Sequence, residues 1–165
     1  LDDINRLREQ FRPGRRLVII GGGYIGLEAA AVGIKKQLDV TLVEALPRLL
    51  ARVTGPELSQ YYDGVHRRHG VHIRLGAGVE ALEVFQSHQG EVDLVVSDVV
   101  MPEMDGPTLM KHLRSERPEV KIIFISGSAE DAFRRNLSDT EELMFLQKPF
   151  HLKEVAAAVK AALQG

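Results

Sequence analysis

Residues 16–28 decide the fold, and they read RLVIIGGGYIGLE. Four apolar residues run directly into a glycine-rich turn and an alanine-rich helical pattern follows, which predicts a strand, a tight turn and a helix. Gly21, Gly23 and Gly26 have the spacing G-x-G-x-x-G. We expect the first to let the backbone turn sharply, the second to let a ligand approach the main chain, and the third to allow close helix–strand packing. The unpaired N–H groups at the start of the helix suit an anion.

A second strand and an acidic residue follow at the distance typical of dinucleotide-binding folds. Residues 40–43 read VTLV and are followed by Glu44, 18 residues after Gly26. An acid at the tip of the second strand can hold the hydroxyls of a ribose. The glycines, the strand, the helix and the acid together predict a dinucleotide site. A tight turn that binds no ligand is the alternative explanation.

The composition is that of an ordinary globular protein and excludes several functions. Of the 165 residues, 44% are hydrophobic and 27% are charged, and the formal net charge is -2. There is no basic field to attract nucleic acid or an acidic membrane, so neither partner is expected. The sequence has no cysteine, which excludes disulfides and thiolate chemistry. No apolar run is long enough to span a membrane and no signal peptide is visible, so we expect a soluble protein.

Two smaller features concern the histidines and the start of the chain. His66, His69 and His72 lie close in sequence, but a helix followed by a strand would separate them, so we expect no metal site. The chain begins at Leu1 without a methionine, which indicates an excised or trimmed segment.

The rest of the chain continues to alternate helices and strands. Thr54 and Glu57 have the spacing of a capping box at the start of a helix. This alternation predicts a parallel sheet that is covered on both faces. The expected strands are 17–20, 40–43, 71–75, 92–98, 121–125 and 143–146, and the expected helices are 1–11, 24–38, 54–69, 79–90, one from 107, one from 128, and 152–163.

Long stretches of the first half match a known family. They read LDDINRLREQF, LVIIGGGYIGLEAAAVGIKKQLDVTLVEALPRLLARVTGPELS and GVHIRLGAGVEALE. This text resembles the NAD-binding domain of flavin-dependent ferredoxin reductases, in the pyridine nucleotide–disulfide oxidoreductase superfamily. The resemblance implies that Glu44 is the acid that binds the ribose and that Arg52 contacts the adenosine side. It also implies a phosphate loop formed by Gly21, Gly22, Gly23, Tyr24, Ile25 and Gly26. The flavin domain is missing, so we expect no flavin and no reductase activity.

The second half contains GVEALEVFQSHQGEVDLVVSDVVMPEMDGPTLMKHL, VKIIFISGS and FLQKPFHLKEV. This text resembles a response-regulator receiver domain. The resemblance implies that Asp98 is the phosphoacceptor, Ser126 the switch hydroxyl and Lys148 the lysine paired with the phosphoryl group. A receiver's first strand ends in two acids that hold Mg²⁺, whereas the first strand here ends in glycines. One carboxylate cannot assemble an octahedral Mg²⁺ site, so this site is expected to be vestigial and without metal.

The two resemblances meet within residues 76–84, where the text GVEALE fits both families. We interpret the chain as a single chimeric α/β domain, with a Rossmann-like half over 1–77 and a receiver-like half over 78–165, made by engineered recombination. A natural degenerate receiver is the alternative. Dinucleotide folds have the strand order 3-2-1-4-5-6 and receivers have 2-1-3-4-5. The fourth strand must therefore pair with the first, which predicts a three-layer αβα sandwich around a doubly wound, parallel, six-stranded sheet of order 3-2-1-4-5-6.

The function expected from these features is a scaffold without designed catalysis that retains weak NAD(H) binding. The alternatives are a functional dinucleotide-binding module and a degenerate receiver phosphorylated at Asp98. An enzyme is not expected, because the receiver pattern accounts for Ser126 and Lys148 and no other nucleophile–base pair is evident. Asp98 should weaken NAD binding, since a carboxylate ~6–8 Å from a pyrophosphate costs roughly 2–3 kcal/mol at an effective dielectric of ~20. NADP should bind more weakly still, because Glu44 would repel its 2′-phosphate.

Overall fold

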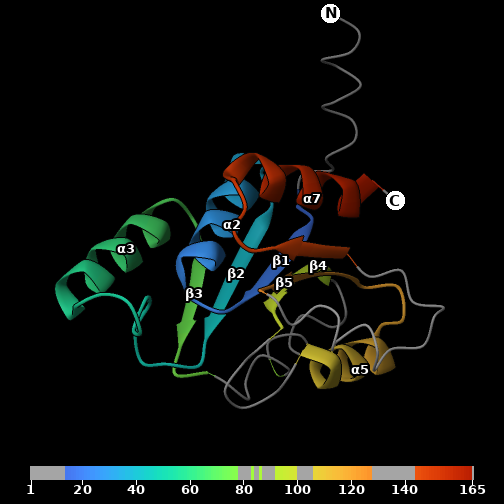
Figure 1. The fold of residues 1–165 in the computed structure, drawn as a ribbon, viewed down its shortest axis with the longest axis horizontal. Coiled ribbons are helices and arrows are strands. Elements are labelled where there is room, and N and C mark those ends of the chain that lie inside the picture. The colour runs from blue at the N-terminus through green and yellow to red at the C-terminus, as the bar shows by residue number, and fades with distance from the viewer. Residues whose placement is uncertain are drawn as a thin grey trace, which may run out of the picture.

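The computed structural model of the protein describes residues 14–77, 83, 86, 92–99, 106–127 and 144–164. Within these ranges the chain forms one parallel sheet with helices on both faces (Figure 1). The strands are β1 (Arg16–Ile20), β2 (Asp39–Glu44), β3 (His72–Leu75), β4 (Val92–Asp98), β5 (Lys121–Ser126) and β6 (Met144–Gln147). The helices are α2 (Tyr24–Lys35), α3 (Pro56–Arg68), α5 (Gly106–Glu116) and α7 (Leu152–Gln164). The helices predicted over 1–11 and from 128 lie outside the described residues, as does most of 79–90, in which Glu83 and Gln86 are helical.

The order of the strands is β3-β2-β1-β4-β5-β6, which confirms the prediction. Each neighbouring pair is parallel, and β1 lies between β2 and β4. The run β2-β1-β4-β5-β6 has the connectivity of the receiver order 2-1-3-4-5, and β3 adds one strand at its edge. The two halves of the chain therefore meet in the middle of the sheet, along β1 and β4.

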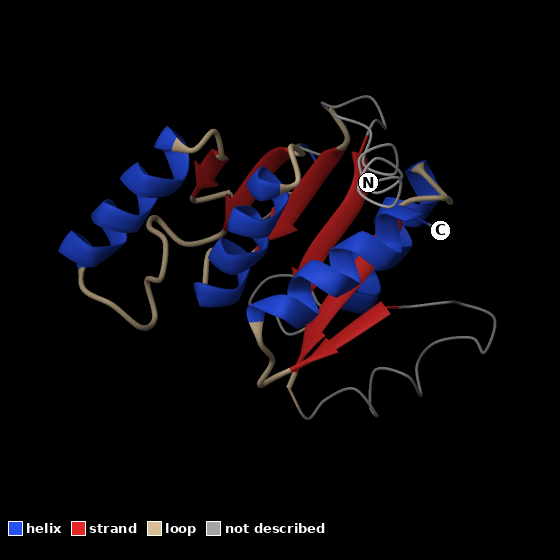
Figure 2. Cartoon of the chain, turned by 90° about the horizontal axis from the view of Figure 1, so that it is seen from above, coloured by secondary structure: helices blue, strands red, loops and turns tan. Residues whose placement is uncertain are grey.

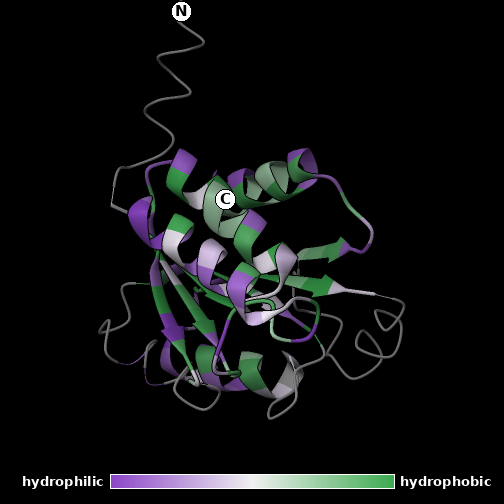
Figure 3. Cartoon of the chain, turned by 90° about the vertical axis from the view of Figure 1, so that its left-hand side faces the viewer, coloured by the Kyte–Doolittle hydropathy of each residue, from purple (hydrophilic) through white to green (hydrophobic). Residues whose placement is uncertain are grey.

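Two apolar layers hold the helices against the sheet. In β1, Leu17 and Ile19 belong to the layer beneath α2 and α7, whereas Val18 belongs to the layer that includes α5, as the two-residue period of a strand requires. Figure 2 shows α2 and α7 side by side over the strands, and Figure 1 shows α5 on the opposite face. The strands between the layers carry mostly the hydrophobic colour in Figure 3. Because β1, β4 and β5 are apolar on both sides, they have to lie between two layers of helices.

Helix α2 packs closely on the sheet because four of its six buried residues are glycine or alanine. Ala29 and Ala30 are both 0% exposed. Gly33 is another of these buried residues, and a Cβ atom at Gly33 would lie 2.7 Å from side-chain atoms of Leu17 and Val40. The contact between α2 and the sheet has no room for an added methyl group there.

Two helix ends differ from the prediction. Helix α2 ends at Lys35, earlier than expected, because Gln37 adopts the left-handed conformation with a φ of 60° and turns the chain towards β2. The predicted capping box of α3 is wrong. The N-cap residue is Gly55, which makes no side-chain hydrogen bond, while Thr54 Oγ1 donates to the carbonyl oxygen of Leu50 at 3.4 Å. Among the described helices, none combines the length and the apolar composition that a membrane crossing demands.

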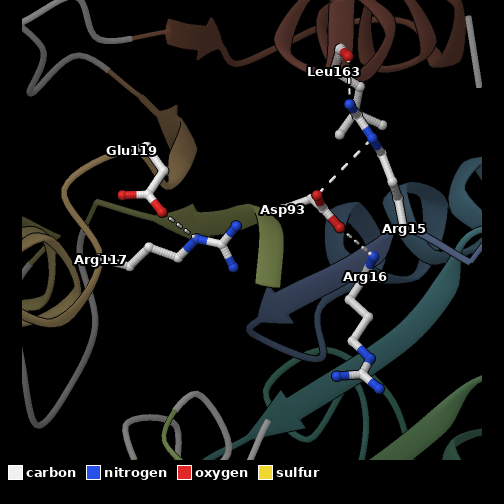
Figure 4. A network of polar contacts seen from close by, with 6 residues as sticks. All are labelled: Arg15, Arg16, Asp93, Arg117, Glu119 and Leu163. Carbon is white, nitrogen blue, oxygen red and sulfur yellow. Dashed lines mark hydrogen bonds and ion pairs between the residues drawn. The ribbon is translucent and has the colours of Figure 1, made fainter. Parts of the chain in front are cut away.

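A polar network joins the two halves at the amino-terminal edge of the sheet. The pairing of β1 with β4 shifts by one residue at Asp93. Oδ2 of Asp93 accepts a hydrogen bond from the backbone N–H of Arg16 at 2.9 Å, and Oδ1 lies 3.9 Å from Nε of Arg15. Nη1 of Arg15 also donates to the carbonyl oxygen of Leu163 at 2.5 Å. Figure 4 shows this carboxylate between the two arginines, so one side chain connects β4 to β1 and, through Arg15, to α7.

We predict that Asp93→Ala lowers the free energy of unfolding by about 1–2 kcal/mol, because the N–H of Arg16 loses its acceptor in a half-buried place. Urea denaturation measures the change. The control is Glu119→Ala, which removes the ion pair between Arg117 and Glu119 seen in Figure 4. The side chain of Glu119 is 69% exposed, so this loss should stay below ~0.5 kcal/mol. Equal losses in the two variants would contradict a joining role for Asp93.

Candidate functional site

The carboxyl ends of β1 and β4 form the switch point of the sheet. The chain leaves β1 towards α2 on one face and leads from β4 to α5 on the other. Ligands of open α/β sheets bind in the crevice at such a point. The register pairs Ile20 with Ser97, so the next residues, Gly21 and Asp98, follow on adjacent strands that lie ~5 Å apart.

The glycine loop adopts the sharp turn that the sequence predicts. Gly21 has a φ of +115°, a value that favours glycine, and its N–H donates to the carbonyl oxygen of Val43 at 2.8 Å. A Cβ atom at Gly26 would lie 1.9 Å from the carbonyl oxygen of Gly21. A Cβ atom at Gly23 would meet no atom within 4 Å. Gly26 therefore serves the fold, whereas Gly23 leaves open space beside the loop.

The first turn of α2 is left available to an anion. Gly23 is the N-cap residue, it makes no side-chain hydrogen bond, and the first turn contains no acidic residue. The first N–H groups of a helix have no partner within the helix, and the positive end of its dipole adds to their attraction for anions. Gly23 and Tyr24 are exposed, whereas Gly22 and Gly26 are buried. The side chain of Ile25 packs against the apolar layer beneath α2.

Glu44 holds the glycine loop from the end of β2. Its Oε2 accepts a hydrogen bond from the N–H of Gly22 at 2.6 Å, and its Oε1 accepts one from the N–H of Leu46 at 2.8 Å. These two bonds fix the carboxylate beside the loop. Each carboxylate oxygen has a second lone pair, so both oxygens of Glu44 can accept a further hydrogen bond. Sequence reasoning assigned Glu44 to the ligand and missed its role in holding the loop.

The segment that follows Glu44 packs against the glycine loop. Leu49 is 0% exposed, and its Cδ2 lies 2.7 Å from the position that a Cβ atom of Gly22 would take. The N–H of Leu50 donates to the carbonyl oxygen of Gly22 at 2.8 Å. Arg52, which the sequence places on the adenosine side, is exposed on this segment. A residue larger than glycine would not fit at position 22, because the side chain of Leu49 occupies the space that its Cβ atom would need.

Arg48 and Ser59 fix this segment, and the sequence analysis did not identify either residue. Nη1 of Arg48 donates to the carbonyl oxygen of Thr54 and to Oγ of Ser59, both at 2.8 Å, and Nη2 donates to the carbonyl oxygen of Ala51 at 3.0 Å. Oγ of Ser59 donates to the carbonyl oxygen of Leu49 at 2.6 Å. Most of these contacts are made to backbone carbonyl groups, so no pattern of side chains in the sequence could reveal them.

The second half of the chain contributes an ion pair at the carboxyl ends of the strands, where the glycine loop also lies. Nζ of Lys148 donates to Oδ2 of Asp98 at 2.8 Å. The N–H of Lys148 donates to the carbonyl oxygen of Ser126 at 2.7 Å, which ties the end of β6 to β5. Oγ of Ser126 donates to the carbonyl oxygen of Gly127 at 3.1 Å. The side chains of Asp98 and Lys148 therefore meet, and Ser126 is linked to them through its backbone.

This ion pair changes the expected electrostatics of the crevice. Asp98 continues the alternation of Leu94 and Val96, which pack beneath α2 and α7, so it belongs to the face that carries the glycine loop. The predicted repulsion of a pyrophosphate assumed a carboxylate without a cation beside it. Since Lys148 compensates the charge of Asp98, the repulsion is smaller than a bare carboxylate would cause.

The Mg²⁺ site of a receiver does not fit these residues. The strand that would supply an acid pair ends in Gly21, Gly22 and Gly23. Oδ2 of Asp98 is already bonded to an ammonium group. Across the described ranges, no group of three or more histidine, aspartate or glutamate residues could hold a metal ion. The chemistry of the donors therefore disfavours a divalent cation here.

Two of the three neighbouring histidines make separate contacts. Nδ1 of His69 lies 2.8 Å from the carbonyl oxygen of Val65, and Nε2 of His72 lies 3.7 Å from Oδ1 of Asp39. The pKa of His66 is lowered from its usual value by partial burial, and His69 adds to this effect while Asp63 opposes it.

Two family models match the chain, and their matches overlap. The family described as "Pyridine nucleotide-disulphide oxidoreductase" matches residues 1–105, and the one described as "Response regulator receiver domain" matches residues 58–160. The overlap, 58–105, includes β3, β4 and all but the first two residues of α3. The predicted seam at 76–84 lies inside this overlap.

Similar proteins come from both families. The chain is 56% identical over 98 residues to the sensor kinase CckA of Brucella abortus, a match that covers 59% of this chain and 10% of that protein. It is 45% identical over 100 residues to the 5,5'-dehydrodivanillate O-demethylase ferredoxin reductase subunit of Sphingobium, covering 61% of this chain and 24% of that protein. The chain therefore spans a small part of each relative.

A solved structure supports the fold. A two component transcriptional regulator AraC from Clostridium phytofermentans aligns with a TM-score of 0.57 and 18% identity, covering 92% of this chain and 93% of that one. At this identity the likeness concerns the fold alone. It agrees with the observation that five of the strands have receiver connectivity.

We predict that Gly26→Ala lowers the free energy of unfolding by ~2–3 kcal/mol or prevents folding, because its Cβ would collide with the backbone oxygen of Gly21. Gly23→Ala is the matched variant, and it should cost about 1 kcal/mol or less, as expected for alanine at an N-cap position. Thermal and urea unfolding measure both. Similar losses would mean that the loop does not have the geometry described.

Proposed function

Because the chain belongs to the pyridine nucleotide-disulphide oxidoreductase family through residues 1–105 and to the response regulator receiver family through residues 58–160, we propose that it is an engineered recombination of these two folds. The proposed product retains weak NAD(H) binding and has no designed catalytic activity. One sheet shared by both halves supports the recombination. A dinucleotide is the partner that we propose.

The observation that carries the NAD(H) proposal is the uncapped first turn of α2 with open space at Gly23 and with Glu44 fixed beside the loop. The N–H groups of this turn would hold the pyrophosphate, and the free lone pairs of Glu44 would accept bonds from the adenosine ribose. When bound, NAD(H) supplies hydride transfer, and the residues of this chain are proposed to hold it without reacting.

Selectivity for NAD over NADP follows from the same carboxylate. A 2′-phosphate on the adenosine ribose would lie against Glu44, whose two backbone hydrogen bonds keep it in place. Like charges at such a distance repel. Arg52 is exposed nearby in sequence and is proposed to contact the adenosine side.

Catalysis is not proposed for the strand ends of the second half. Oγ of Ser126 donates to the carbonyl oxygen of Gly127, and Lys148 is bonded to Asp98. A nucleophile needs a base that accepts its proton, and neither contact has that arrangement.

A phosphorylatable receiver is the second candidate function. The contact of 2.8 Å between Lys148 and Asp98 favours it. The poor fit of the donors to Mg²⁺ speaks against it, because phosphoryl transfer relies on charge neutralisation around the transferred group.

We predict that NADH binds with a dissociation constant of ~0.1–1 mM in titration calorimetry and that Gly23→Val abolishes this binding by filling the open space beside the loop. Gly55→Val is the matched control. Gly55 is the N-cap residue of α3, with a φ of -72° against -77° for Gly23, and neither residue makes a side-chain cap. The control should bind like the parent. Unchanged binding in Gly23→Val, or none in the parent, would reject the proposal.

We also predict that Asp98 gains no substantial phosphoryl adduct when the protein is incubated with acetyl phosphate and Mg²⁺. The reason is that the receiver-like site around Asp98 does not provide the oxygen ligands that Mg²⁺ requires. Intact mass spectrometry measures the adduct. An abundant adduct in the parent that is lost in Asp98→Asn would favour the receiver function instead.

A further inference from the structure

We propose that Lys148 completes a composite phosphate subsite with the glycine loop, and that its ion pair with Asp98 sets the affinity for the pyrophosphate of a dinucleotide. The subsite combines residues from both halves of the chain. This inference rests on the proposed NAD(H) binding and names the residue outside the first half that controls it.

The geometry places the ammonium group at the same end of the sheet as the glycine loop, bonded to Asp98 on the strand next to β1. Gly21 and Asp98 follow paired residues on adjacent strands, which lie ~5 Å apart. Lys148 comes from β6, two strands beyond β4, yet its Nζ reaches Oδ2 of Asp98 at 2.8 Å. The carboxylate thus holds the lysine side chain next to the switch point, on the face that also carries the start of α2.

The charges of the crevice make this cation important. The wall formed by β2 contributes the carboxylate of Glu44, and the wall formed by β4 contributes that of Asp98. Both oppose a pyrophosphate, while the backbone N–H groups of the loop attract it. An ammonium group has three donors, so Lys148 can keep its bond to Asp98 and still offer N–H groups to a phosphate. Its flexible stem allows it to turn towards the ligand.

The ion pair can be altered without damage to the fold. The side chains of Lys148 and Asp98 are 35% and 38% exposed, and ion pairs that are exposed to this degree contribute little to stability. A change in affinity after substitution would therefore report on the ligand rather than on folding.

The test uses ADP-ribose, which carries the adenosine and pyrophosphate without the nicotinamide, in calorimetric titrations at low salt. Lys148→Met should weaken binding by about five- to tenfold, and Asp98→Asn should strengthen it by a similar factor. The double variant should bind roughly like the parent. All should melt within a few degrees of the parent.

The matched control is Lys121→Met, which removes the same charge at the other end of the strands. Lys121 is exposed and is the first residue of β5. It should bind ADP-ribose like the parent. Equal affinities in Lys148→Met and Lys121→Met would overturn the composite subsite and leave NAD(H) binding intact. A parent that binds neither ADP-ribose nor NADH would overturn the proposed function as well.

Discussion

The pairing of β1 with β4 is the contact on which the rest of the structure depends. Both strands are apolar on both faces, and each would be a sheet edge if its half stood alone. Their ladder joins the halves, and α2 and α7 pack side by side above it (Figure 2). The register is not continuous, because it shifts by one residue at Asp93. At this irregularity the carboxylate of Asp93 accepts a hydrogen bond from the N–H of Arg16. The shift in register therefore does not leave this N–H without an acceptor.

The same pairing brings together the candidate site residues of the two families. Both fold families put their ligands at the carboxyl ends of the strands, at a switch point. Because β4 pairs with β1, the glycine loop and Asp98 lie at the same ends of adjacent strands. The carboxylate of Asp98 would repel an anion bound at the loop. The bond from Lys148 to Asp98 at 2.8 Å reduces this repulsion, because it compensates the negative charge.

The glycines of the loop divide into those that the fold needs and one that a ligand would need. A Cβ atom would meet a backbone oxygen at Gly26 and the side chains of Leu49 and Glu44 at Gly22. Gly21 needs its positive φ. These constraints hold whether or not a dinucleotide binds. A Cβ atom would meet no atom within 4 Å at Gly21 or at Gly23, but only Gly23 lacks a positive φ that would itself require glycine. The spacing of the glycines is therefore mainly evidence for a turn, and the claim for a ligand depends on Gly23.

The sequence by itself determined the elements and their order. The sequence predicts a parallel sheet with the fourth strand beside the first. This prediction follows from strands that are apolar on both faces, from glycines at fixed spacing and from the two recognisable halves. Such patterns can be found in the sequence because they depend on residues that are close together in the chain. Only the tertiary structure decided which side chains meet. The bond from Lys148 to Asp98 spans 50 residues, the one from Arg16 to Asp93 spans 77, and the one from Gly22 to Glu44 spans 22. Such contacts depend on strand register and on the reach of individual side chains, and a shift of one residue moves a side chain to the other face of the sheet.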